Sequence, residues 1–303
     1  MEAILVKAAG LALIILAGYT LKRLGIFRTE DAKVISRVVI NLTLPAAFIT
    51  GFRNFAFQPE YLIVIIIALA CNFLLLGIGF LLTKGKDIPT RALYAMNLSS
   101  YNIGTFVLPF AQSFLPAQAI VGVSMFDAGN CPVNCGISYA LVMGRDGGSV
   151  KDSLKMVVDK LLHSVPFMTY LLLMVKCAVG LEFPEPVYAV ASMVGSANSF
   201  LAMLMIGILF QLKVEKEDLR QVLRILGVRY GVNLLVVALL WQMPLSRMVR
   251  QVLALALVAP VPSVALVFCE RCGCKPTVYG MVSSLSIAIS LALTFILMLL
   301  NLF

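Results

Sequence analysis

The sequence predicts an all-α polytopic membrane protein of ten transmembrane helices, arranged as two inverted five-helix repeats with broken, crossing helices 4 and 9. Three observations support this fold class. Apolar residues make up 61% of the 303 residues and charged residues 13%, and the mean hydropathy is +0.98. Apolar stretches of about 20 residues, each long enough for one crossing, recur along the chain. A polar or proline-containing interruption also falls in the fourth expected helix of each half.

The ten expected spans cover residues 3–21, 34–54, 61–83, 91–114, 117–143, 160–180, 187–211, 221–242, 248–269 and 277–301. Their connections are short. The longest polar connection, 144–159, is expected to be a cytoplasmic linker between a first repeat over 1–143 and a second over 160–303, within one membrane domain. An odd number of helices per repeat means that the second half enters the bilayer from the opposite face, so the repeat is inverted.

Positive charge is distributed unevenly over these connections. The net charge is +9, and most lysines and arginines fall in the odd-numbered connections, among them Lys84, Lys86, Lys275 and, between helices 7 and 8, Arg229. Such a bias predicts that the odd connections face the cytoplasm of a bacterial inner membrane, with both termini outside. It argues against a nucleic-acid partner. On this interpretation no arginine or lysine lies deep in any span.

The two interruptions predict where a central site lies. The first is NLSSYNIGTFVLPF at residues 97–110, and the second is ALVAPVPSVALVF at 256–268, with Pro260 and Pro262 in its middle. Backbone freed from helical hydrogen bonds at membrane depth is tolerated only where it is buried in protein or lines a watery cavity. Paired interruptions in corresponding positions are the usual sequence signal of a binding site at the midplane.

Five stretches resemble the auxin efflux carrier family: INLTLPAAF, YNIGTFVLPF, FDAGN, SFLAMLMIGILF and APVPSVALVF. The resemblance implies a secondary transporter, with the plan also found in bile acid/sodium symporters, whose broken helices 4 and 9 cross at the substrate site and move against a scaffold containing helices 1, 2, 6 and 7. It matches Asn102 to the substrate-contacting asparagine and Pro260 to the crossover proline of helix 9. Tyr101 stands where plant members have the other crossover proline, so Gly104 and the polar run are expected to break helix 4. For a bacterial member the implied substrate is a small carboxylate such as malate or malonate, or an auxin-like anion.

With no basic side chain in the spans, an organic anion would be held by the N-terminal ends of the two half-helices, where unpaired N–H groups and the macrodipole favour negative charge. Neutral donors would add to this. The candidate substrate-binding residues are Asn102, Ser99, Ser100, Gly104, Pro260, Ser263 and Asn41. The alternative is that these small polar residues only permit close helix packing. Asn198 and Gly207 in helix 7 form a weaker counterpart of the kinked segment around Asn41 in helix 2.

Asp127 is the one carboxylate placed well inside an expected span, and ionisable residues at such positions are costly and usually functional. The hypothesis is that Asp127 takes up a coupling proton or lends its charge to a bound cation such as sodium, with Asn130, one helical turn on, sharing the role. The alternative is a buried aspartate that fixes packing against a neighbouring helix.

Other chemistry is poorly supported. The motifs HExxH and GxSxG and a phosphate-binding loop are absent, so the chain is not expected to be an enzyme or a pump, and no cofactor or metal is expected. Cys269, Cys272 and Cys274 are spaced as in a zinc site but lack an evident fourth ligand. The single histidine, His163, is expected at the surface.

The expected partners are the lipid bilayer and the anion, and a homodimer stays open. Two alternatives for the function also stay open, namely a sodium-coupled organic anion symporter of the bile acid type and a membrane sensor that binds but does not transport.

Overall fold

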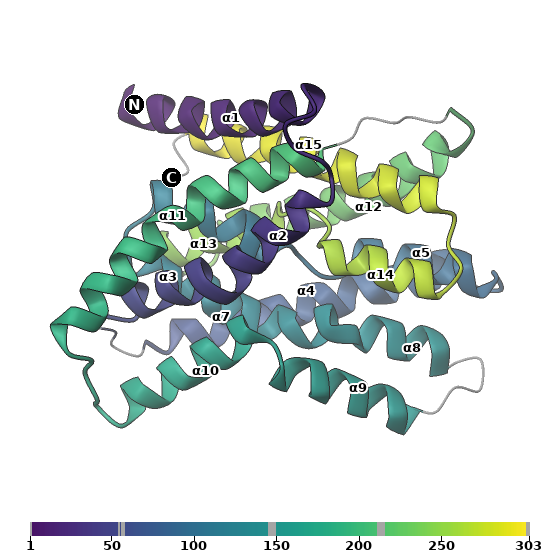
Figure 1. Ribbon diagram of the computed structural model, residues 1–303. Coiled ribbons are helices and arrows are strands. Elements are labelled where there is room, and N and C mark those ends of the chain that lie inside the picture. Colours follow the sequence, from purple (N-terminus) through teal and green to yellow (C-terminus); the bar gives the residue numbers. More distant parts are fainter. Residues whose placement is uncertain (1, 54, 56–57, 145–149, 211–215, 301–303) are drawn as a thin grey trace.

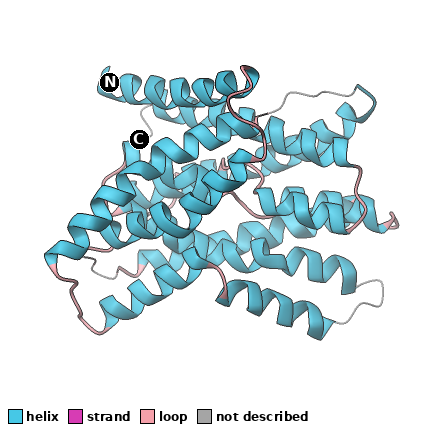
Figure 2. Cartoon of the chain, viewed as in Figure 1, coloured by secondary structure: helices cyan, strands magenta, loops and turns pink. Residues whose placement is uncertain are grey.

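The computed structural model describes residues 2–53, 55, 58–144, 150–210 and 216–300, and within these ranges the regular structure is entirely helical (Figures 1 and 2). The α-helices are α1 (Glu2–Arg23), α2 (Asp31–Val38), α3 (Leu44–Gly51), α4 (Glu60–Leu82), α5 (Ile88–Leu98), α6 (Leu108–Phe114), α7 (Ala119–Pro132), α8 (Ser138–Gly144), α9 (Val150–Leu162), α10 (Val165–Ala178), α11 (Glu185–Leu209), α12 (Lys216–Leu240), α13 (Arg247–Leu257), α14 (Ser263–Arg271) and α15 (Pro276–Leu299). Three π-helical turns, η1 (Val39–Thr43), η2 (Ile103–Val107) and η3 (Val133–Ile137), join neighbouring α-helices.

Five helical segments of the described chain are long and apolar enough to cross a membrane. They are Asp31–Gly51, Glu60–Leu82, Glu185–Leu209, Lys216–Leu240 and Pro276–Met298, and a sixth results if the bent pair Lys155–Leu162 and Val165–Ala178 counts as one span. Each of the ten ranges expected from sequence contains a helix or an interrupted helix. The helices α5 and α13 have only 11 residues each. Each piece of such an interrupted span is therefore too short to be identified by its length as a membrane crossing. The full count of ten crossings stays a prediction.

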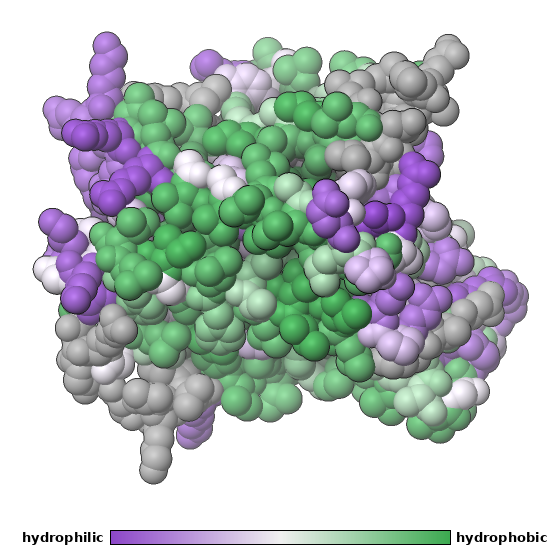
Figure 3. Space-filling model, turned by 180° about the vertical axis from the view of Figure 1, so that it is seen from behind, coloured by the Kyte–Doolittle hydropathy of each residue, from purple (hydrophilic) through white to green (hydrophobic). Residues whose placement is uncertain are grey.

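The outer surface has the character of a membrane protein. Large hydrophobic side chains are strongly exposed on several helices, for example Leu81 at 75% and Met193 at 77%. Figure 3 shows hydrophobic residues covering the middle of one face, with hydrophilic residues gathered towards its left and right edges. An apolar band between two polar ends fits burial in a bilayer.

Prolines explain two of the π-helical turns. Pro45 follows η1 and Pro109 follows η2, each at the beginning of the next α-helix. A proline ring clashes with the carbonyl four residues earlier, which here belongs to Asn41 and Thr105, both inside the wider π turn. The wider turn accommodates the ring without ending the helix, so these prolines do not make the main breaks.

The helices pack in two groups. In the first, α1 lies along α11 at the upper edge of Figure 1, α11 packs on α2, η1 and α3, and α10 packs on α3. The second contains α4 to α8 and α12 to α15, and the groups meet where α11 contacts α6 and α3 contacts α7. Gly18 and Gly207 allow α1 and α11 to approach closely, because a Cβ at either position would overlap the backbone of the other helix.

The expected linker 144–159 is partly helical. Residues 145–149 lie outside the described residues, whereas α9 begins at Val150. Its sequence VKDSLKMVVDKLL is amphipathic, and Val157 is buried. A bend of 69° follows, where Ser164 caps α10 by accepting a hydrogen bond from the Phe167 amide at 3.5 Å.

Candidate functional site

The break in the first half lies between Leu98, the last residue of α5, and Ile103, the first of η2. Ser100 has a positive φ of 63°, and its amide donates to Oδ1 of Asn72 on α4 at 2.7 Å. Asn130 on α7 holds the next residue from both sides: its Oδ1 accepts from the Tyr101 amide and its Nδ2 donates to the Tyr101 carbonyl, both at 2.9 Å. Neighbouring side chains therefore satisfy the backbone groups that the missing helical turn leaves open.

Of the two features expected to break helix 4, the polar run does so and Gly104 does not. Gly104 was expected to interrupt the helix, but it lies inside η2 without a positive φ, and the non-helical residues are 99–102. Asparagine side chains from two neighbouring helices hold the open backbone, so glycine is not needed. This is a correction to the geometry expected for Gly104.

The break in the second half lies between Leu257, which ends α13, and Ser263, which begins α14. Its Val261 amide donates to Oγ of Ser286 on α15 at 3.2 Å. The two breaks are in direct contact, because the Asn102 amide donates to the Pro260 carbonyl at 3.1 Å. The structure therefore brings the two interruptions to one point, as their corresponding positions in the sequence predict.

A fully buried arginine lies between the breaks. Arg229 on α12 has 0% of its surface exposed, and its guanidinium carbon lies 4.8 Å from the centre of the Tyr101 ring. The guanidinium donates to five backbone carbonyls, those of Asn97 (3.2 Å), Leu98 (2.6 Å), Ser100 (2.8 Å), Ala259 (3.1 Å) and Pro260 (3.4 Å). The charge pattern of the sequence predicts Arg229 in a cytoplasmic connection and no basic residue deep in a span. That expectation is wrong.

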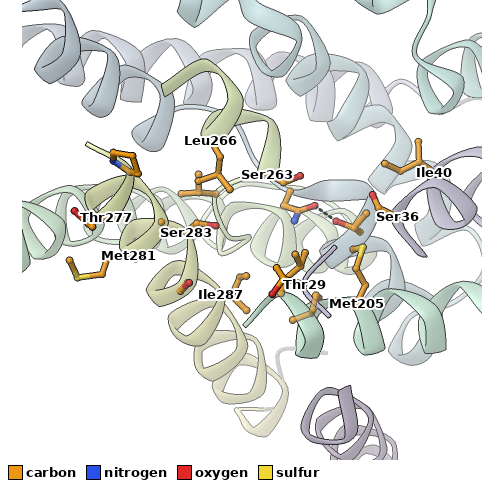
Figure 4. A pocket seen from close by; sticks show the side chains of 18 residues that line it. Thr29, Ser36, Ile40, Met205, Ser263, Leu266, Thr277, Met281, Ser283 and Ile287 are labelled. Atoms are coloured by element: carbon orange, nitrogen blue, oxygen red, sulfur yellow. Dashed lines mark hydrogen bonds between the residues drawn. The ribbon is translucent and has the colours of Figure 1, made fainter. Parts of the chain in front are cut away.

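A cavity of about 450 Å³ lies beside the crossing and between the two helix groups (Figure 4). Ser36 and Ile40 line it on one side, and Met281 and Ser283 line it on the other. No charged residue lines the cavity. Its polar lining consists of one amide and seven hydroxyl side chains, those of Asn102, Thr29, Ser36, Thr105, Ser263, Thr277, Ser283 and Ser284. The exposed Pro276 and Thr277 belong to the lining, so the cavity extends from the breaks to one end of the molecule.

The candidate substrate-binding residues fall into two sets. Asn102 and Ser263 line the cavity, each where the helix after a break begins. Oδ1 of Asn102 accepts from Thr105 Oγ1 at 2.6 Å, which leaves the Asn102 amide nitrogen as a donor.

The second set lies behind or outside the cavity. Ser99 is buried, donating to Ala95 O at 2.6 Å and bonding Ser138 Oγ at 2.8 Å. Ser100 and Pro260 accept from Arg229. Gly104 packs near Leu44, and Asn41 is exposed, donating to the Arg37 carbonyl at 2.8 Å. None of these five residues borders the cavity.

The two candidate coupling residues lie together on α7. Asp127 is 8% exposed, and its Oδ1 accepts from Asn130 Nδ2 at 3.0 Å. Because Asn130 also holds the Tyr101 backbone, one hydrogen-bonded chain runs from the carboxylate to the residue before Asn102. Asp127 does not line the cavity, so its connection to the site is through this chain.

Other residues singled out from sequence have structural contacts. Asn198 on α11 accepts from Thr43 Oγ1 at 3.0 Å and donates to Gln112 Oε1 at 2.9 Å, joining three helical segments. His163 is exposed and lies 3.3 Å from the Asp159 carboxylate. The seven cysteines are free thiols, and no group of three or more histidine, cysteine or acidic residues in the described ranges is arranged to hold a metal.

Sequence reasoning missed Arg229, Asn72 and the α15 serines. Arg229 carried a usable signal, because it lies well inside the expected span 221–242 with apolar residues on both sides. That position already argues against a place in a connection. The α15 serines carried none, since serine is common in membrane helices.

Comparison with known proteins gives one weak similarity. The chain is 21% identical over 143 residues to a protein of Methanothermobacter thermautotrophicus strain Delta H that is named an uncharacterized transporter. The match covers 45% of this chain and 47% of that protein, so the chain spans about half the length of the curated relative it matches. No protein-family model matches. The apolar helices define the class as a helical membrane protein, and 143 residues of the alignment resemble a protein named a transporter.

Proposed function

We propose that the protein is a secondary transporter that moves a small organic anion across the bacterial inner membrane by alternating access, as a member of the auxin efflux carrier family. One observation carries the proposal: Asn102 and Ser263, at the starts of the half-helices that follow two touching breaks, border the same cavity. The name of the archaeal relative supports transport in general.

The chemistry of the cavity favours an anion with carboxylate groups. Its polar side chains are neutral donors, and the ends of η2 and α14 that face it carry the positive side of the helix dipole. The negative ends, at α5 and α13, are neutralised by Arg229, which does not line the cavity. A volume of about 450 Å³ is within the range of small-molecule sites.

The position of the cavity supports alternating access. Ser36 and Met205 come from the first helix group, whereas Thr105 and Ser263 come from the second. The second group contains helices 4 and 9 of the ten-span plan. A rigid movement of this group against the first would close this cavity and open another on the far side. The open end lies at connections expected in the cytoplasm, so this state corresponds to inward access.

Coupling to protons follows from Asp127. Protonation of Asp127 would remove the negative charge of the carboxylate that accepts the hydrogen bond from Asn130. A weaker bond there would loosen the hold of Asn130 on the Tyr101 backbone. A sodium-coupled carrier of the bile acid type is less well supported, because Arg229 already donates to the carbonyls at the crossing. We also propose a homodimer.

Purified protein tests the proposal in two steps. A screen of thermal unfolding against small carboxylates at several pH values should identify a ligand that raises the melting temperature. Counterflow in liposomes then separates the carrier from a sensor: a carrier accumulates labelled ligand against an internal unlabelled pool, and a sensor binds without exchange. A protein that neither binds nor exchanges any carboxylate contradicts the proposal.

A further inference from the structure

The surroundings of Arg229 raise the question of what balances its charge. None of the described aspartates or glutamates forms an ion pair with it, although the side chain is fully buried. An unpaired buried cation costs several kcal/mol. The five backbone carbonyls that accept its hydrogen bonds provide compensation, together with the Tyr101 ring beside the guanidinium.

These carbonyls belong to the C-terminal ends of two helices. Asn97 and Leu98 are the last residues of α5, and Ala259 and Pro260 follow the end of α13. Each helix end carries the equivalent of about −0.5 elementary charge, so two ends converging on one point add up to about −1. A single guanidinium offsets this charge, and it also satisfies carbonyls that have no partner within their own helix.

Converging carbonyls of unwound backbone and helix C-termini are the ligands that monovalent cations use inside membrane proteins. We propose that the five carbonyls form a monovalent-cation site that the protein fills with its own tethered cation, the guanidinium of Arg229. A bound sodium or potassium ion is consequently not needed to hold the two breaks together. Any conclusion about the coupling ion rests on the proposed transport function. The existence of the cation site does not rest on it.

Arginine suits this role better than lysine. Its planar group spreads donors over carbonyls from both breaks, whereas the lysine ammonium is a compact point charge with three donors. The Tyr101 ring covers the guanidinium, and the Tyr101 hydroxyl donates to Asn233 Oδ1 at 2.9 Å, one turn after Arg229 on the same helix. These contacts fix the orientation of the group between the two backbone segments.

The proposal is tested by thermal unfolding of the purified full-length protein in detergent. Arg229→Ala, Arg229→Lys and Arg229→Gln are compared with wild type and with Arg224→Ala, which removes an exposed arginine from the same helix. Each protein is melted in sodium, potassium or choline chloride at equal ionic strength, and in choline with millimolar guanidinium chloride added.

We expect wild type, Arg224→Ala and Arg229→Lys to melt at temperatures that do not depend on the cation. Arg229→Ala and Arg229→Gln should melt lower in choline and recover by at least about 2 °C when sodium, potassium or guanidinium is supplied. Guanidinium rescue of Arg229→Ala is the decisive readout, since a purely space-filling side chain would not be replaced by a free cation.

The proposal is overturned if folded Arg229→Ala melts at the same temperature in every salt, or if wild type itself requires sodium. Should Arg229→Ala not fold in any salt, the comparison of Arg229→Gln with Arg229→Lys decides. An equal cation response in these two variants, or failure of Arg229→Lys to fold, contradicts a tethered-cation role. Since no solute is transported in this assay, its outcome is separate from that of the counterflow test.

Discussion

The backbone amide of Asn102 donates a hydrogen bond to the carbonyl of Pro260, across 3.1 Å and between the two halves of the chain. The same carbonyl also accepts from Arg229. The contact joins the two helix breaks at one point. The cavity lies beside the N-terminal ends that follow the breaks, and the guanidinium binds carbonyls at the C-terminal ends that precede them.

Removal of one cavity hydroxyl should weaken binding without affecting the fold. Ser263→Ala deletes a donor at the start of α14, and a hydrogen bond to a charged ligand contributes about 1.5–3 kcal/mol, so the dissociation constant of the identified carboxylate should rise about tenfold or more. Ser196→Ala, on an exposed face of α11, is the matched control. Equal affinities of the two variants in titration calorimetry would remove Ser263 from the site.

The role of Asp127 is tested by Asp127→Asn, which keeps the shape of the side chain and imitates its neutral form. Uptake driven by a pH gradient should disappear, whereas exchange of labelled for unlabelled ligand at constant pH should persist. Liposome assays of both modes on the same preparation give the comparison. Gradient-driven uptake at the wild-type rate would show that Asp127 is only a packing residue.

The close approach of α1 and α11 predicts unequal effects of two identical substitutions. Gly18→Ala places a methyl group against the α11 backbone and should destabilise the protein by about 1–3 kcal/mol. Gly10→Ala, on the same helix with open space around it, should be neutral or slightly stabilising, because alanine favours helix. Melting temperatures of the two variants are the measurement, and a similar loss in both would contradict this packing.

An ion pair at the loop between α10 and α11 predicts a pH dependence. Hydrogen bonds donated by Lys176 and then Tyr188 hold the pKa of Glu182, in the loop before α11, below its ordinary value. A lowered folded-state pKa means that the stabilisation is present above the unfolded value, about 4.3, and is lost as the pH falls through the folded value. Glu182→Gln should therefore melt below wild type at neutral pH, and the difference should vanish in acid. A difference independent of pH would argue against the ion pair.

The positions of the helices could be predicted from sequence because hydrophobic burial in a bilayer requires long apolar segments, which are visible in one dimension. The contact of the breaks could be predicted because freed backbone must be buried. The exact break could not: Ser99 to Asn102 open because Asn72 and Asn130, distant in sequence, hold the backbone. The depth of Arg229 could be predicted from its place inside the span 221–242. Its position at the breaks could not, since its partners are carbonyls, which every residue has.

Only some of the site residues could be predicted from the sequence. Asn102 and Ser263 line the cavity because they stand where the helices after the breaks begin, whereas Asn41 lies in η1 and is exposed. Which face a side chain presents depends on the helix rotation, and η1 changes that rotation by its extra residue per turn. Such a change has no local sequence signature beyond the proline that follows.

Counterflow of a labelled small carboxylate into liposomes, with wild type and Asn102→Ala side by side, tests the central claim most directly. The account predicts rapid accumulation by wild type and loss of most of it in Asn102→Ala, with both proteins folded and equally inserted. Accumulation that is equal in the two proteins, or wild-type protein that binds the carboxylate and never exchanges it, would contradict a carrier whose solute meets the protein at this crossing.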